Sequence, residues 1–286
     1  MQYRTIGDVR VSAIGLGGMP MSIEGRHDRD TSIATIHASL DAGVTLIDTA
    51  DSYHLRADEV GHNESLIADA LDAYGRPDDV LIATKGGHLR PGDGTWTVDG
   101  SPEHLRQACD ASLKRLRVDA IGLYQFHRPD PRVPFAESVG TLAELLDAGK
   151  IRMAGVSNAD PDQIRQAQDI LGGRLVSVQN QFSPSFRSSE PELELCDRLG
   201  IAFLPWSPLG GISRAAALGS RFAPFAEVAA AHGASPQQVC LAWLLAKSPA
   251  LIPIPGSSRP ATARDSAAAV DLTLAPDEFA RLDAAG

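Results

Sequence analysis

Short apolar runs alternate with longer segments of mixed polarity along almost the whole chain. The runs are rich in Ile, Leu and Val, which is typical of strands that are buried on both faces. They span residues 13–17, 45–47, 80–84, 121–126, 151–156, 175–179, 201–206 and 250–254. Helical patterns lie between them, and no break in composition divides the chain. The alternation predicts an α/β fold, a closed (β/α)₈ or TIM barrel that residues 1–286 form as a single domain.

Local signals support the helices and add a hairpin. Ser101-Pro102-Glu103 combines a serine N-cap, a proline at the first helical position and an acid in the first turn. Ahead of the first strand, residues 3–5 and 9–11 flank Gly7-Asp8, which predicts a short β-hairpin that caps the barrel floor. Residues 88–100 form the longest loop-like stretch. Because they directly follow a strand, we expect them to overhang the mouth of the barrel.

Four polar residues lie at or just beyond strand ends. Asp48, Lys85 and His127 follow the second, third and fourth predicted strands, and Tyr53 comes shortly after Asp48. A barrel enzyme gathers its active site at the carboxyl ends of its strands. A neighbouring ammonium favours phenolate and makes tyrosine a better proton donor. We expect Lys85 to act on Tyr53 in this way, held by Asp48, while His127 orients a substrate carbonyl.

Each of these residues also has an ordinary structural interpretation. Asp48 could cap a turn, Tyr53 could be a packing residue, and Lys85 could be a solvated charge beside two glycines. His127 precedes Arg128-Pro129 and could also cap a turn. Their joint occurrence at consecutive strand ends favours the catalytic hypothesis.

Composition narrows the possible classes of function. The net charge of −10 and the lack of a Lys/Arg run argue against binding to nucleic acid or to a membrane surface. Neither a signal peptide nor an apolar run near the ~18 residues needed to cross a bilayer is visible. Cys109, Cys196 and Cys240 lie far apart and indicate reduced, buried thiols. We therefore expect a cytoplasmic protein, and no metal site because no His-x-His or His-Glu-x-x-His pattern occurs.

Several short motifs occur in one characteristic order. They occupy residues 47–53, 83–85, 124–130, 155–158, 178–180, 205–210 and 254–258. Each motif alone is weak, but together the chain resembles the aldo-keto reductase superfamily over nearly its whole length. The resemblance implies a barrel that transfers a hydride from NAD(P)H to an aldehyde or ketone.

The resemblance also implies residue roles. Tyr53 would donate the proton, Lys85 would lower its pKa, Asp48 would support Lys85, and His127 would orient the carbonyl. Trp206 would stack on the nicotinamide ring. The cofactor-binding residues that the resemblance implies are Gly18, Met19, Asp48, Ser157, Asn158, Gln179, Trp206, Ser207, Leu209, Gly256, Ser257, Ser258, Arg259 and Arg264.

The choice of cofactor depends on residues 256–266. The sequence departs from the family pattern here, because Gly256 and Thr262 stand where many members carry Lys and Arg. Arg259 and Arg264 could replace the missing charge at the 2′-phosphate. We therefore expect NADP (NADPH) rather than NAD.

Two other functions remain open on the sequence. A cofactor-binding regulatory subunit or redox sensor could keep the four residues and turn over slowly. A barrel hydrolase or aldolase could use Lys85 as a Schiff-base lysine. We expect a small-molecule carbonyl substrate, of unspecified identity, and a monomer by default.

Overall fold

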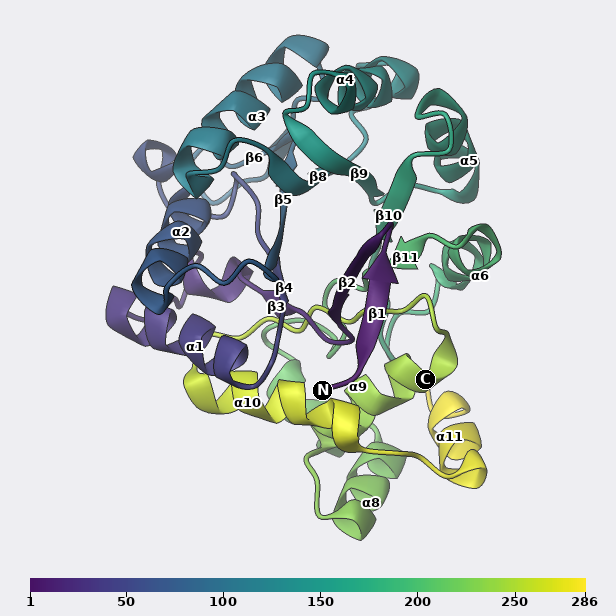
Figure 1. Cartoon of the computed structure of the whole chain (residues 1–286). Coiled ribbons are helices and arrows are strands. Elements are labelled where there is room, and N and C mark those ends of the chain that lie inside the picture. Colours follow the sequence, from purple (N-terminus) through teal and green to yellow (C-terminus); the bar gives the residue numbers. More distant parts are fainter.

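Seven parallel strands form a curled sheet in the computed structural model, which describes residues 1–286, in the order β11-β10-β9-β8-β5-β4-β3. The strands are β3 (Leu16–Gly17), β4 (Leu46–Asp48), β5 (Leu81–Gly86), β8 (Ile121–Phe126), β9 (Ile151–Ser157), β10 (Leu175–Gln179) and β11 (Ala202–Phe203). Figure 1 shows the strands arranged in a ring with the helices outside it. This is the predicted (β/α)₈ barrel.

The helices follow their strands as expected. They are α1 (Arg29–Asp41), α2 (His62–Tyr74), α3 (Pro102–Leu116), α4 (Phe135–Asp147), α5 (Pro161–Ile170), α6 (Glu190–Leu199), α7 (Leu218–Arg221), α8 (Ala223–His232), α9 (Pro236–Lys247), α10 (Pro260–Ala268) and α11 (Pro276–Asp283). Short 3₁₀ turns are η1 (Met19–Met21), η2 (Ala57–Glu59), η3 (Ala215–Ala217) and η4 (Ala269–Asp271). The N-cap predicted for α3 forms, because the Ser101 hydroxyl accepts a backbone N–H of the first turn, and Ser235 caps α9 in the same way.

Residues 250–256 close the ring between β11 and β3. The amides of Gly15 and Gly17 donate to the carbonyls of Pro253 and Pro255 at 2.9 and 3.0 Å, and the same segment exchanges hydrogen bonds with β11 on its other side. The two prolines have no amide hydrogen, so they interrupt the ladder. The eighth predicted strand is therefore an irregular closing segment, which corrects the expectation of a regular strand there.

A two-residue period separates the inner and outer faces of the strands. On β5, Leu81 and Ala83 belong to the inner apolar cluster, and Lys85 continues the same face toward the mouth. Ile82 instead packs outward with the larger cluster under the helices. The inner faces of β4, β5 and β8 thus run from apolar residues at the start of the strand to polar residues at its end.

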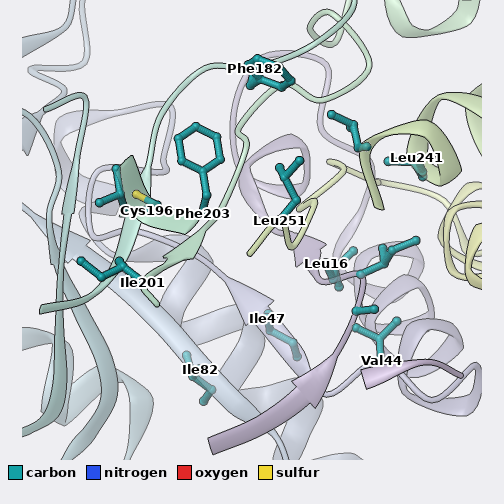
Figure 2. Packing of buried hydrophobic residues seen from close by; sticks show 14 of the residues in the cluster. Leu16, Val44, Ile47, Ile82, Phe182, Cys196, Ile201, Phe203, Leu241 and Leu251 are labelled. Atoms are coloured by element: carbon teal, nitrogen blue, oxygen red, sulfur yellow. The ribbon is translucent and has the colours of Figure 1, made fainter. Parts of the chain in front are cut away.

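The larger core lies between the strands and the helices. It contains 52 buried residues, against 11 in the barrel interior and at its floor. Figure 2 shows part of it, with Ile47 and Ile82 from neighbouring strands and Phe203 and Leu251 from the closing region. Most of the apolar burial that stabilises the fold is therefore outside the barrel lumen.

The hairpin β1 (Tyr3–Ile6) and β2 (Val9–Ser12) covers the floor, as predicted. Ile6 and Val11 are completely buried and pack with Leu46 and Leu81 at the starts of β4 and β5. Figure 1 shows both hairpin strands lying across the middle of the ring. None of the helices has the length and apolar character that crossing a membrane would require.

Candidate active site

Asp48, Lys85 and Tyr53 meet at the carboxyl ends of β4 and β5. The register pairs Asp48 with Ala83, so Lys85 lies one inward position beyond it on the adjacent strand. Lys85 Nζ donates to Asp48 Oδ1 at 2.6 Å, to the Thr49 carbonyl at 2.7 Å and to the Tyr53 hydroxyl at 3.3 Å. All three ammonium hydrogens are thus accounted for, although the Lys85 side chain is fully buried.

Pairing keeps Lys85 charged. Burial alone would lower its pKa, but the Asp48 carboxylate and Tyr53 outweigh that effect, and the pKa of Lys85 lies above its usual value. For Tyr53 the balance is the opposite, because burial raises the pKa of the phenol more than Lys85 lowers it. Lys85 therefore acts on Tyr53 with the expected sign, but burial keeps the pKa of Tyr53 above the ordinary value.

His127 lies on the other side of Tyr53. The two rings meet edge to face with centroids 5.9 Å apart, and His88 packs against His127 at 4.8 Å. Burial, reinforced by the charge of Lys85, holds the pKa of His127 far below its usual value. The imidazole is therefore neutral and retains one N–H, which can donate to a substrate oxygen.

A cavity of about 360 Å³ opens above these residues. Asp48, Tyr53 and His127 line it, whereas Lys85 lies behind them. Of the residues expected to bind the cofactor, its lining includes Met19, Asp48, Ser157, Asn158, Gln179, Trp206, Ser207, Leu209 and Gly256. Those outside the lining are Gly18, Ser257, Ser258, Arg259 and Arg264. Three of the four residues expected to be catalytic and most of the expected nicotinamide contacts thus line one cavity.

A hydrogen-bond network fixes the polar wall of this cavity. Asn158 Nδ2 donates to the His127 carbonyl at 3.0 Å, and Asn158 Oδ1 accepts from Trp206 Nε1 at 3.2 Å. Gln179 Nε2 donates to Asp48 Oδ2 at 2.8 Å, and Ser157 Oγ donates to the Gln179 carbonyl at 2.6 Å. Asn158 also has a φ of 57°, a conformation that favours glycine or asparagine. The network ties the indole of Trp206 to the catalytic side of the cavity.

Several polar side chains in the segment after residue 256 are already engaged in hydrogen bonds within the chain. The hydroxyls of Ser257 and Thr262 lie 2.5 Å apart. Asp265 Oδ2 accepts from Ser235 Oγ at 2.8 Å. Arg259 and Arg264 are exposed and have no ion-pair partner. These two arginines are therefore the free charges at the start of α10.

A second hairpin covers one side of the mouth. The predicted loop at 88–100 contains the antiparallel pair β6 (His88–Leu89) and β7 (Thr97–Val98), so it is more ordered than expected. Within it the rings of His88 and Trp96 stack with centroids 4.8 Å apart. Burial lowers the pKa of His88 to about 4. The hairpin thus presents two neutral rings to the cavity.

A family model of the aldo/keto reductase family matches residues 13–286. The chain belongs to this family. Among curated relatives, an uncharacterized oxidoreductase of Schizosaccharomyces pombe is 36% identical over 98% of this chain and 89% of its own length. The 6-dehydroglucose reductase of Novosphingobium aromaticivorans is 35% identical over 94% of this chain and 90% of its own length. The pyridoxine 4-dehydrogenase of Escherichia coli is 32% identical over 98% and 96% of the two chains.

Solved structures support the same assignment. A thermostable aldo-keto reductase in complex with the inhibitor epalrestat superimposes with a TM-score of 0.84, at 28% identity over 100% of both chains. An aldo/keto reductase from Klebsiella pneumoniae in complex with NADP and acetate gives a TM-score of 0.79, at 28% identity over 96% and 91%. The chain is therefore an oxidoreductase of the aldo-keto reductase family.

Sequence reasoning missed several residues of this aldo-keto reductase site. Arg90 is buried beneath Trp96 and pairs with Glu24, which lines the cavity from the loop after β3. Asn63 accepts a hydrogen bond from Thr49 and donates to the Gly18 carbonyl, which fixes that loop beside the catalytic strand. These are contacts between distant segments, and no local pattern in the chain marks them.

Proposed function

We propose that this protein reduces an aldehyde or ketone to an alcohol with NADPH and that Tyr53 donates the proton. The observation that carries the proposal is the placement of Lys85 within hydrogen-bond distance of both Asp48 and Tyr53 at the base of the cavity. Such an arrangement of a charged donor behind a phenol matches the needs of a general acid.

Different residues of the chain hold the proton, stabilise the charge that remains when it leaves, and orient the carbonyl. NADPH, when bound, supplies the hydride. Tyr53 holds the proton at its hydroxyl, and the Lys85 ammonium stabilises the phenolate that remains when this proton leaves. Asp48 keeps the ammonium in place and is itself held by Gln179. His127, neutral and beside Tyr53, donates to the same carbonyl oxygen and thereby orients it.

The cavity wall is suited to a nicotinamide. Trp206 offers an aromatic surface that its bond to Asn158 holds in place. The Ser157 hydroxyl donates to the Gln179 backbone carbonyl and accepts from Asn158 Nδ2 at 3.0 Å, so one lone pair of its oxygen is left to accept from an amide N–H such as that of a carboxamide. These features support the expected contacts of Ser157, Asn158, Gln179 and Trp206.

The preference for NADPH over NADH rests on charge near α10. Arg259 and Arg264 are unpaired in a chain whose net charge is −10. A 2′-phosphate would give each guanidinium an anionic partner. The related Klebsiella pneumoniae reductase in complex with NADP supports this assignment.

Oxidation of NADPH and, separately, of NADH with a reactive aromatic aldehyde tests the proposal. Tyr53→Phe should reduce turnover by roughly two or more orders of magnitude, the usual contribution of a positioned general acid. Tyr124→Phe is the matched control, because the Tyr124 hydroxyl is buried outside the cavity and has no hydrogen-bond partner. Cofactor binding, followed by quenching of tryptophan fluorescence, should survive in both variants.

Two results would contradict the proposal. Retained turnover in Tyr53→Phe would remove Tyr53 from the role of proton donor. NADPH binding without turnover of any carbonyl compound would favour a regulatory subunit or redox sensor. A Schiff-base function of Lys85 is not favoured by the structure, because it requires a neutral amine and the pKa of Lys85 is raised.

A further inference from the structure

Arg128 differs from every other arginine that the fold buries or half-buries. The other six each donate to a carboxylate or a backbone carbonyl: Arg4, Arg26, Arg76, Arg90, Arg115 and Arg187. Arg128 is half-buried and makes no hydrogen bond or ion pair with the chain. A charge withdrawn from water is costly unless it is paired. Its guanidinium is therefore left for a partner that the chain does not supply.

The position of Arg128 is next to the chemistry. It directly follows His127, and both residues line the cavity. Its charge is felt by both neighbouring imidazoles, because it adds to the effect of burial in lowering the pKa of His88 and of His127. An anion bound by Arg128 would therefore lie close to the residue that orients the carbonyl.

Arg128 also sets the charge balance of the cavity. The lining contains two carboxylates, and each is already neutralised: Asp48 pairs with Lys85, and Glu24 pairs with Arg90. The histidines of the lining have lowered pKa values and are neutral. One uncompensated positive charge remains, which favours an anionic ligand over a neutral or cationic one.

We propose that Arg128 binds a carboxylate of the substrate, so that the preferred substrates are aldehydes or ketones that also carry a carboxylate group. This inference rests on the proposed function and narrows its substrate class. A guanidinium presents parallel N–H donors that match the two oxygens of a carboxylate, which fixes the orientation of the substrate as well as its affinity.

Cofactor phosphate is the other possible source of such an anion, but the topology separates it from Arg128. In the strand order β11-β10-β9-β8-β5-β4-β3, β8 is the central strand, with three strands on each side. The ring closes between β11 and β3 through the segment that leads to Arg259 and Arg264. Arg128 at the end of β8 thus lies across the mouth from the charges expected to bind the 2′-phosphate.

The test compares 4-formylbenzoate with its neutral methyl ester as substrates for NADPH oxidation. In Arg128→Leu, the ratio of kcat/KM for the acid to that for the ester should fall by about 10- to 100-fold, mostly through KM, the range expected for a lost hydrogen bond to a charged group. Arg128→Lys should lie between the two, because an ammonium cannot form the paired contact. Arg152→Leu is the matched control, since Arg152 is exposed near the start of β9 at the opposite end of the barrel and its loss removes the same charge.

A binding measurement separates this inference from the proposed function. Benzoate should bind to the wild-type protein loaded with NADP, by calorimetry, and bind about tenfold or more weakly to Arg128→Leu. Absence of benzoate binding, or equal binding by both proteins, would overturn the role of Arg128 even if carbonyl reduction is observed. Weaker NADPH binding by Arg128→Leu, with both substrates affected alike, would also overturn it by assigning the guanidinium to a cofactor phosphate. Failure of all NADPH-dependent turnover would instead contradict the proposed function.

Discussion

At the floor of the barrel the strands begin with apolar side chains and a hairpin covers them, whereas at the mouth the same strands end in charged side chains that are just as deeply buried. Ile6 and Lys85 both have 0% exposure. Burial of Ile6 is favourable in itself, because it removes apolar surface from water. Burial of Lys85 is unfavourable and is offset only by Asp48, Thr49 and Tyr53. Burial thus adds to stability at the floor, whereas at the mouth it costs stability and holds a charged group beside Tyr53.

Replacement of Lys85 should have the largest effect, because it affects both the turnover and the stability of the protein. Lys85→Met should reduce turnover by about 100-fold or more by removing the charge that assists Tyr53. It should also lower the free energy of unfolding by about 3–5 kcal/mol, because Asp48 is left as an uncompensated buried charge. Steady-state kinetics and urea unfolding measure the two effects.

A double variant separates the loss of stability from the loss of turnover. Adding Asp48→Asn to Lys85→Met should recover part of the lost stability without recovering activity. Full activity in Lys85→Met would show that turnover does not depend on the buried ion pair between Lys85 and Asp48.

At the floor, Ile6→Ala should change stability alone. Truncation of this completely buried side chain should lower the free energy of unfolding by about 2–5 kcal/mol, through lost burial and the cavity left behind. Turnover per folded molecule should stay within about twofold at 25 °C. A large fall in kcat with little loss of stability would mean that the floor and the mouth of the barrel are coupled.

The pH dependence of stability should reveal a buried neutral histidine at the mouth. Burial lowers the pKa of His88 to about 4 in the folded protein, while the unfolded chain has the ordinary value near 6.5. Between these values the unfolded state binds a proton that the folded state does not, so stability is full above about pH 6.5 and falls as the pH drops toward 4. His88→Phe should reduce that slope by up to about 1.4 kcal/mol per pH unit, as measured by urea unfolding across the window. An unchanged slope would show that His88 titrates normally.

The smallest effects are expected at the two exposed arginines near the start of α10. Arg259→Ala and Arg264→Ala should each weaken NADPH binding by up to about tenfold, equivalent to about 1.4 kcal/mol, because exposed charges are screened. NADH serves as the internal control, since it lacks the 2′-phosphate and its affinity should not change. Equal weakening of both cofactors would assign these arginines to another contact.

The sequence predicted the residues at the mouth of the barrel better than the segment at 250–256 that closes the ring or the exposed arginines that follow it. Asp48, Lys85 and His127 could be placed because each directly follows an apolar run that predicts a strand, and parallel strands bring their ends together. Tyr53 lies in the loop five residues past Asp48, so its place in the group was inferred from nearness in sequence, and the family resemblance implied the same role. The hairpin and the barrel were also confirmed. The hairpin was predicted from a turn signal between two short runs, and the barrel from the alternation of strand and helix patterns, and all of these are local features of the sequence.

Other features depend on contacts that no local pattern reveals. Pro253 lies in the predicted strand at 250–254 and Pro255 directly follows it, and both residues lack the amide donor that a ladder needs. The balance of pKa effects at Tyr53 follows from how completely the phenol is buried, which is a property of the whole fold. The missing partner of Arg128 likewise becomes visible only when every neighbouring side chain is in place.

The closing segment has a consequence for how the protein assembles during synthesis. The amides of Gly15 and Gly17 donate to the carbonyls of Pro253 and Pro255, so this joint of the ring cannot form until that distant segment has been synthesised. Contacts so distant in sequence form slowly, because the intervening chain must first be ordered. Until then the inner apolar row that includes Leu46, Leu81 and Leu123 is open along one edge. The two ends of the curled sheet therefore stay unjoined until the segment near residue 255 is in place.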